Sequence, residues 1–358
     1  MKGWITSMTN PYIIAGPCSA ESEQQVWETA RVLSADERIS CMRAGVWKPR
    51  TRPKSFEGMG SVALPWLASA QRAFSLPVMV EVARAAHIEE ALRHNINRFW
   101  VGARTTVNPF SVQELADALR GADVEVYVKN PLNPDLQLWI GAIERFQSSG
   151  ISKIAAIHRG FSTYETGIYR NTPNWEIPVE LKTTMPELPI ITDPSHIAGQ
   201  RHLVMHVAQQ ALDLGFDGLM VETHPAPESA LSDPLQQLPL AELSEWLNQL
   251  TVRNPTFQDE ATLEELEQLR RKIDEIDRKL IDQLCERLQI VERIGQYKAE
   301  HNVAIFQLMR WIEIFNDRMA QGELKGIPNE LISKIWQAIH TASLKLQTEV
   351  VHSNSHGE

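Results

Sequence analysis

The stretch YIIAGPCSAES, residues 12–22, contains the pattern that decides the fold. A short apolar, β-branched run ends at Gly-Pro, a cysteine follows, and a helix-like stretch begins. Comparable runs, each leading into a loop and a helix-like stretch, recur as far as residue 224. They are YIIAGP (12–17), ISCMRAGVW (39–47), PVMVEVA (77–83), RFWVGA (98–103), EVYVKN (125–130), KIAAIH (153–158), PIITDP (189–194) and GLMVETH (218–224). Eight buried strands that alternate with helices predict a closed parallel (β/α)8 TIM barrel.

An open doubly wound sheet is the alternative for this α/β pattern. Such sheets usually have fewer strands, and no Gly-x-Gly-x-x-Gly turn follows the first strand here. The span also fits the roughly 250 residues usual for the barrel. The barrel is therefore the favoured prediction for residues 1–250.

The composition limits the classes of partner and the compartment. A formal net charge of -10 argues against nucleic acid and against an anionic membrane surface. No apolar run approaches the roughly 18 residues of a membrane span, and the N-terminal residues do not resemble a signal peptide. Three widely separated cysteines favour a reducing cytoplasm. An anionic ligand would therefore need local clusters of arginine and lysine.

A second domain follows a polar linker, TVRNPTFQDE, at 251–260. Residues 261–352 predict an all-α domain of three helices, and the tail 353–358 is expected to be disordered. Apolar residues recur at steps of three and four from Leu263 to Ile294, which predicts a first helix of some 40 residues and roughly 60 Å. Further helices are predicted at about 305–321 and 328–350. The first helix is too long to bury its apolar stripe against them, so we expect a homodimer through these helices, with a tetramer as the larger alternative.

Chemistry in a (β/α)8 barrel lies where the strands end, and these ends carry a distinctive set of side chains. One thiol, one imidazole and two carboxylates are supplied by Cys18, His196, Glu222 and Asp233. Five cations lie at the ends of four of the strands, namely Arg43 with Lys48, Arg104, Lys129 and Arg159. A single cysteine or histidine is usually structural, but four such groups at one face are a less probable accident. The mixed S/N/O set suits one divalent Mn, Fe, Co or Zn ion, and the cations suit phosphate and carboxylate groups.

The motifs AGPCSAES, KPRTRPKSFEG, GAR, TDPSH and VETHP…SDPLQQL resemble 3-deoxy-D-arabino-heptulosonate 7-phosphate (DAHP) synthases, particularly the type I beta subgroup, from residue 12 to about 250. The resemblance implies condensation of phosphoenolpyruvate with erythrose 4-phosphate, the first step of the shikimate pathway. It implies metal ligands at Cys18, His196, Glu222 and Asp233. Phosphoenolpyruvate would be bound by Arg43, Lys48, Arg104, Lys129 and Arg159, and erythrose 4-phosphate by Arg50 and Thr51. Lys48 would be catalytic, as the group that manages the proton.

The related 3-deoxy-octulosonate 8-phosphate synthases are the rival family for the barrel. They carry Ala-Asn-Arg where this sequence has Pro49-Arg50-Thr51. Two segments also depart from the usual DAHP synthase pattern. VKNP (128–131) replaces Lys-Arg-Gly, and GARTT (102–106) lacks the usual asparagine after arginine.

Residues 261 to about 350 resemble the all-helical chorismate mutases, which rearrange chorismate to prephenate. Ligand positions of that family fall on Arg270, Arg287, Lys298, Arg310, Ser343 and Gln347. Arg270 lies 17 residues before Arg287, roughly 25 Å along a helix, so we expect it to reach the partner chain's site. Two acidic positions of the family are Gln307 and Trp311 here, so we expect an active mutase, with a weakened one as the alternative.

Three interpretations of the whole chain remain open at this point. The first is a bifunctional, allosteric enzyme in which prephenate inhibits the synthase. The second makes the helical domain a module that senses chorismate or prephenate and dimerises. The third is a metal aldolase with an unrelated helical oligomerisation domain, which the set of mutase-like positions disfavours.

Overall fold

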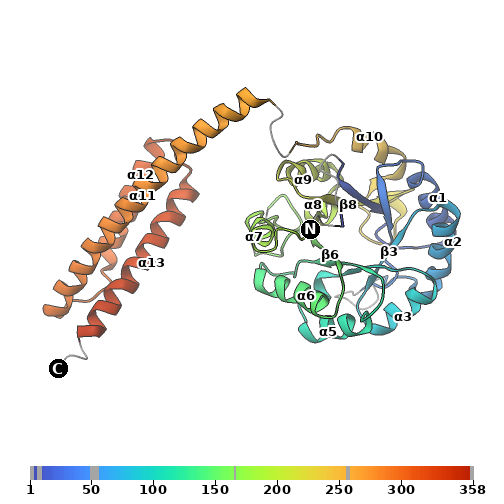
Figure 1. Ribbon diagram of the computed structural model, residues 1–358, viewed down its shortest axis with the longest axis horizontal. Coiled ribbons are helices and arrows are strands. Elements are labelled where there is room, and N and C mark those ends of the chain that lie inside the picture. The colour runs from blue at the N-terminus through green and yellow to red at the C-terminus, as the bar shows by residue number, and fades with distance from the viewer. Residues whose placement is uncertain (1–3, 6–9, 49–55, 165–166, 255–258, 355–358) are drawn as a thin grey trace. The chain divides into compact units, whose positions relative to one another are not determined.

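The computed structural model describes residues 4–5, 10–48, 56–164, 167–254 and 259–354. The chain divides into two compact units, residues 1–256 and 257–358. Figure 1 shows a ring of strands and helices for the first unit and long helices for the second. In the described part of the chain, no helix combines the length and the apolar character that crossing a membrane requires.

The first unit is the predicted closed barrel of parallel strands. The strands are β1 (Tyr12–Gly16), β2 (Ile39–Arg43), β3 (Val78–Val82), β4 (Arg98–Val101), β5 (Glu125–Lys129), β6 (Lys153–His158), β7 (Ile190–Thr192) and β8 (Gly218–His224). Each strand pairs with the next, and β1 also pairs with β8 from Tyr12–Gly218 to Gly16–Glu222. The barrel is closed by this last pairing. A short β9 (Leu238–Pro239) adds to the end of β8.

Helices cover the outside of the barrel, as the alternating pattern predicts. They are α1 (Glu23–Leu33), α2 (Leu64–Phe74), α3 (Ala85–Arg93), α5 (Pro109–Ala118), α6 (Leu136–Ser148), α7 (Glu176–Thr184), α9 (Arg201–Asp213) and α10 (Leu243–Asn248). Two short helices, α4 (Ala103–Thr106) and α8 (Pro194–Ala198), lie in the loops after β4 and β7. Side-chain caps start several of these helices. Ser22, for example, accepts a hydrogen bond from Gln25 N at the start of α1.

Six strands end one to four residues earlier than the predicted runs, and the differences at β2 and β7 matter for the site. β2 ends at Arg43, so Lys48 lies in the following loop. β7 ends at Thr192, because Asp193 caps α8 and Pro194 occupies its first position. Because these strands stop early, Lys48 lies in a loop and Asp193 at the start of a helix, both at the barrel mouth.

Large apolar side chains fill the barrel interior. This inner cluster includes Ile5, Met79, Trp100, Tyr127 and Met220, and Trp4 packs against it. A larger cluster lies between the strands and the helices. The filled interior leaves the carboxyl ends of the strands as the rigid floor on which polar side chains are held.

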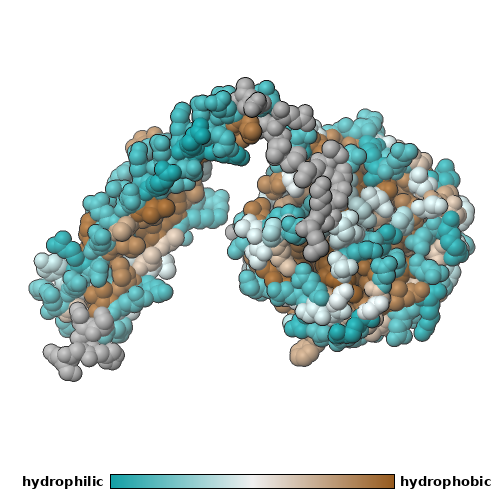
Figure 2. Space-filling model, viewed as in Figure 1, coloured by the Kyte–Doolittle hydropathy of each residue, from teal (hydrophilic) through white to brown (hydrophobic). Residues whose placement is uncertain are grey.

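The second unit consists of α11 (Glu260–Glu300), α12 (Leu308–Leu324) and α13 (Asn329–Asn354). The 41-residue α11 confirms the long first helix, and α12 begins three residues later than predicted. Helix α13 extends two residues into the predicted tail, and the last four residues lie outside the described ones. Exposed apolar side chains run along α11, and Figure 2 shows an apolar strip on this unit.

Candidate active sites

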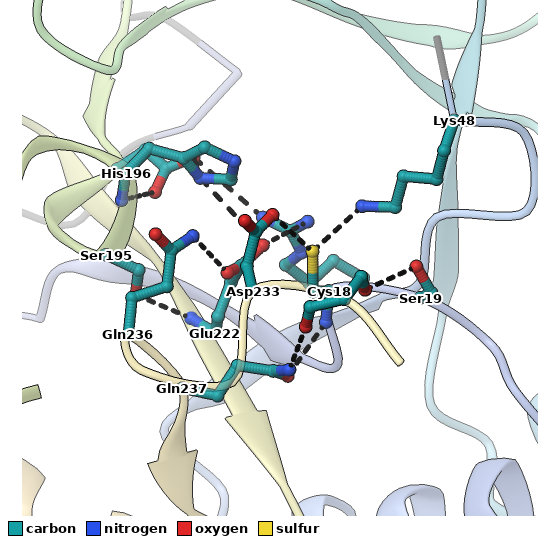
Figure 3. A network of polar contacts seen from close by, with 12 residues as sticks. Cys18, Ser19, Lys48, Ser195, His196, Glu222, Asp233, Gln236 and Gln237 are labelled. Atoms are coloured by element: carbon teal, nitrogen blue, oxygen red, sulfur yellow. Dashed lines mark hydrogen bonds and ion pairs between the residues drawn. The ribbon is translucent and has the colours of Figure 1, made fainter. Parts of the chain in front are cut away.

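The barrel mouth brings together side chains from strands that are far apart in the sequence (Figure 3). Cys18 follows β1, Arg43 ends β2, Lys129 ends β5 and Glu222 lies in β8. His196 lies on α8, Asp233 in the loop after β8, and Arg159 directly after β6. Arg104 is exposed on α4. Arg50 and Thr51, the predicted erythrose 4-phosphate ligands, lie outside the described residues.

The thiol of Cys18 is the centre of one group of contacts. Lys48 Nζ donates to Cys18 Sγ at 2.9 Å, and Asp233 Oδ2 lies 3.2 Å from the same sulfur. Burial, reinforced by the negative charge of Glu222, raises the pKa of the Cys18 thiol to about 12. Burial lowers the pKa of Lys48, but its interactions with Cys18 and with the carboxylate of Glu222 outweigh burial, and the net direction is upward. Lys48 is therefore a protonated donor at this position.

The carboxylate of Glu222 is the centre of a second group, and it is fully buried. Arg43 Nη2 lies 2.9 Å from Oε1, and Gln236 Nε2 donates to Oε2 at 2.6 Å. Burial would raise the pKa of Glu222, but its electrostatic interactions with the His196 imidazole, Arg43 and Lys48 outweigh burial and lower it. Because Arg43 is also buried, removal of either partner would leave an uncompensated charge in the barrel mouth.

Asp193 is a functional candidate that the sequence reasoning missed. Lys129 Nζ donates to Asp193 Oδ2 at 2.8 Å, and His196 Nδ1 lies 2.9 Å from the same oxygen. Its other oxygen accepts from His196 N at 3.1 Å, as the N-cap of α8. The sequence did offer a signal for Asp193, because it is the acidic residue of the TDPSH motif. Only His196 of that motif was given a role.

Two of the predicted phosphoenolpyruvate cations lie over an aromatic ring at the floor of the barrel mouth. The guanidinium of Arg43 lies 4.9 Å from the ring centre of Trp100, and Lys129 Nζ lies 5.9 Å from it. Burial lowers the pKa of Lys129, and it lowers that of Arg159 to about 10. Arg159 Nη1 donates to Asn171 Oδ1 at 2.8 Å, which fixes the guanidinium. These cations are held rigidly before any anion binds.

The unusual VKNP segment has a structural reason. Asn130 Oδ1 accepts a hydrogen bond from Arg159 N at 2.7 Å, and Asn130 Nδ2 donates to Gly160 O at 2.9 Å. Asn130 is fully buried, so these bonds satisfy its amide and hold the loop after β6 against the end of β5. The asparagine therefore fixes the backbone that carries Arg159.

The predicted metal ligands are of the chemical types that bind a divalent ion, but their side chains are not arranged around one metal position. Within the described residues, no three His, Cys, Asp or Glu side chains form a group that could hold a metal as they stand. Cations hold three of the predicted ligands instead, namely Lys48 on Cys18, Arg43 on Glu222 and Arg170 on Asp233.

Two buried atoms nevertheless fit a metal at this place. Among the described residues, His196 Nδ1 and Glu222 Oε1 have no partner in hydrogen-bond geometry, although charged atoms lie 2.9 Å from each. These two atoms lie 3.8 Å apart. With the thiol of Cys18 beside Asp233, they form an S/N/O donor set of the kind that first-row divalent ions bind.

The helical unit brings together only part of the predicted mutase-like set. Arg287 Nη1 donates to Ser343 Oγ at 2.7 Å, and Gln347 Nε2 donates to Ser343 O at 3.3 Å. Lys298 Nζ donates to Ile305 O at 2.6 Å. Arg270 and Arg310 instead pair with acidic residues on their own helices, Glu267 and Glu313 respectively. Each of these two arginines is more than half exposed.

His340, for which the sequence indicated no role, lies beside this group. The ring of Trp311 stacks on that of His340, with centroids 3.8 Å apart and planes 13° apart. Burial lowers the pKa of His340, and the charges of Arg287 and Lys298 add to that effect. An imidazole with a lowered pKa thus accompanies Trp311, the position at which the sequence departs from the mutase pattern.

Comparison with known proteins agrees with this architecture. The model of the DAHP synthetase I family matches residues 5–255, and that of chorismate mutase type II matches residues 269–348. A phospho-2-dehydro-3-deoxyheptonate aldolase of Thermotoga maritima is 33% identical over 226 residues, which are 63% of this chain and 64% of that relative. A 2-dehydro-3-deoxyphosphooctonate aldolase of Francisella tularensis subsp. mediasiatica is 26% identical and covers 67% of this chain and 90% of itself.

A solved structure supports the fold independently. The crystal structure of the Thermotoga maritima DAHP synthase superposes with a TM-score of 0.60 at 30% identity, over 67% of this chain and 68% of that one. DAHP synthases as a family generally depend on a metal. The chain belongs to the DAHP synthetase I family and continues into a chorismate mutase type II region.

Proposed function

We propose that the barrel condenses phosphoenolpyruvate with erythrose 4-phosphate to give DAHP and inorganic phosphate. The observation that carries this proposal is the cluster of Arg43, Lys129 and Arg159, each at most 7% exposed, in a chain of net charge -10. Buried, preformed cations favour a small dianionic or trianionic substrate, because they compensate its charge without reorganisation. The name of the 33% identical relative points to the same reaction class.

The chain's own residues would position and neutralise the substrates. Arg43, Lys48, Arg104, Lys129 and Arg159 would bind phosphoenolpyruvate so that its C3 faces the aldehyde carbon of erythrose 4-phosphate, which Arg50 and Thr51 would hold. The new C–C bond forms between these carbons, water adds at C2, and the C2–O bond breaks to release phosphate. Lys48 Nζ, protonated as its contacts favour, would supply the proton for the aldehyde oxygen.

A divalent ion would bind at Cys18, His196, Glu222 and Asp233. When bound, Mn, Co, Fe or Zn supplies Lewis-acid polarisation of the aldehyde oxygen. Asp193 would position His196 by capping α8, where it accepts a hydrogen bond from His196 N, and His196 Nδ1 would be left for the ion.

The test is a synthase assay with phosphoenolpyruvate and erythrose 4-phosphate, repeated after metal removal and after metal is restored. Condensation that persists after rigorous metal removal would contradict the metal assignment. Arabinose 5-phosphate serves as the competing aldose. A preference for it would favour the octulosonate reaction, which the lower identity of that relative disfavours.

For the helical unit we propose chorismate mutase activity, which the contact of the half-buried Arg287 with the buried Ser343, beside the buried Gln347, supports. The Claisen rearrangement needs only a compact substrate conformer and positive charge at the ether oxygen, which Lys298 and Gln347 would supply. The second candidate is a sensor of chorismate or prephenate with weak turnover, favoured by the Trp311–His340 stack. Direct measurement of chorismate loss by the full chain separates the two.

We also propose that the helical unit is dimeric, with a cytoplasmic tetramer as the larger form. The apolar side chains of Ile273, Ile276, Leu280 and Ile281 on α11 are each more than half exposed. A continuous strip of this kind is costly in water, and a second copy of α11 would cover it. Prephenate bound at the mutase site of the helical unit would inhibit the synthase by favouring one arrangement of the two units.

A further inference from the structure

The loop after β8 carries two adjacent buried glutamines whose side chains fix different parts of the barrel mouth (Figure 3). Gln237 Oε1 accepts a hydrogen bond from Cys18 N at 3.0 Å. Gln236 Nε2 donates to Glu222 Oε2 at 2.6 Å. Both glutamines are at least 99% buried. The SDPLQQL motif thus does more than supply Asp233.

The orientation of the Gln236 amide is fixed by what lies on each side of it. Glu222 can only accept, so the NH2 group must face it. On the other side Arg170 Nη1, which can only donate, lies 2.8 Å from Gln236 Oε1. The same Nη1 donates to Asp233 Oδ1 at 3.0 Å. One arginine atom therefore links two carboxylates, directly to Asp233 and through Gln236 to Glu222.

The path of Arg170 to this position is built into the fold. A side chain at Gly199 would place its Cβ 2.4 Å from Arg170 Cβ, so only glycine leaves room for the arginine stem. Gly199 ends α8, the helix that carries His196, and its φ of +70° also favours glycine. Asp233 itself has a φ of +46°, so the loop takes an uncommon turn to present its carboxylate.

We infer that Arg170 and Gln236 form a positioning relay that sets the orientation of Glu222 relative to Asp233. This inference rests on the proposed metal role of those two carboxylates. Neither Arg170 nor Gln236 needs to touch the ion or the substrates. Their effect is to hold the two carboxylate groups, from a strand and from its following loop, in one arrangement.

The test measures binding of Co²⁺ alone to the full chain, so that it does not depend on turnover. The variants are Gln236→Leu, Arg170→Gln and the double variant, with Gln24→Leu and Arg253→Gln as controls at exposed positions. Affinity comes from competition with a coloured chelator. The Co²⁺–thiolate absorption band, which Cys18→Ser should abolish, reports the metal environment. Circular dichroism confirms that each variant is folded, and Arg170→Lys replaces Arg170→Gln if the latter is not.

Each single variant should weaken Co²⁺ binding about tenfold to a hundredfold and alter the absorption band, as loss of outer partners of metal ligands does. The double variant should be no weaker than the worse single one, because both changes break the same relay. Unchanged affinity in the single variants, or losses that multiply in the double one, would overturn the relay. If the unaltered chain binds no Co²⁺, the proposed metal site fails, and the inference fails with it.

Discussion

Mixing two inactive variants tests whether Arg270 and Arg287 serve one mutase site from different chains. The two residues are 17 positions apart on α11, which corresponds to about 25 Å at 1.5 Å per residue. Arg287 lies with Ser343 inside its own chain, whereas Arg270 pairs only with Glu267 among the contacts that the described residues show. A site that uses both arginines therefore requires Arg270 from a second copy.

The expected recovery follows from the symmetry of a dimer. In a mixed dimer of Arg270→Ala and Arg287→Ala chains, one site has both arginines and the other has neither. Random pairing of equal amounts makes about half of all dimers mixed, so about one quarter of all sites are intact. Loss of a buried charged contact to a ligand costs about 2 kcal/mol or more, or roughly a thirtyfold loss of activity, in each parent variant. Recovery to a quarter of the unaltered activity is well above that background.

The assay follows chorismate loss after the two variants are mixed, dissociated and reassembled at several ratios. Activity should rise and fall with the mixing ratio and reach its maximum at equal amounts. Arg287→Ala mixed with Lys298→Ala is the matched control. These residues lie 11 positions apart on one face of α11, so both belong to the same chain's site and no activity should return. A straight-line sum of the parent activities for the first pair would refute the shared site.

Three further predictions concern the barrel and its control. Arg50→Ala should raise the KM for erythrose 4-phosphate far more than that for phosphoenolpyruvate, and equal effects in steady-state kinetics would contradict the assignment. Burial lowers the pKa of His158 to about 3, so the unfolded chain binds the extra proton as the pH falls below about 6.5. His158 lies beside Phe161 and Trp175, so phenylalanine is a suitable replacement. Between pH 6.5 and pH 5, the free energy of unfolding measured with urea should fall by about 2 kcal/mol less in His158→Phe than in the unaltered chain. An equal fall in both would show that His158 does not take up a proton on unfolding. Prephenate should inhibit the synthase of the full chain and leave a truncation that ends near residue 250 unaffected, and inhibition that survives truncation would exclude control through the helical unit.

The sequence alone determined the architecture and the chemical types at the barrel mouth. The order of strands and helices depends on hydrophobic periodicity, which is a local property of the chain. The carboxyl ends of parallel strands must meet at one face, so the thiol, imidazole, carboxylates and cations could be assigned to one mouth before any distance was known. The 41-residue α11 was likewise apparent from apolar residues at steps of three and four.

Tertiary structure alone decided which of these side chains hold one another. Asp193 reaches Lys129 across 64 positions of sequence, and Arg170 reaches Asp233 across 63. The choice of Gln236 rather than Gln237 as the partner of Glu222 depends on the turn at Asp233 and on the register of β8 against β1. Such contacts join segments that no periodicity relates. They arise because loop paths and strand register bring particular donor and acceptor atoms to about 3 Å, the distance at which a hydrogen bond forms. A slightly different loop path or register would separate the same atoms and break the contact.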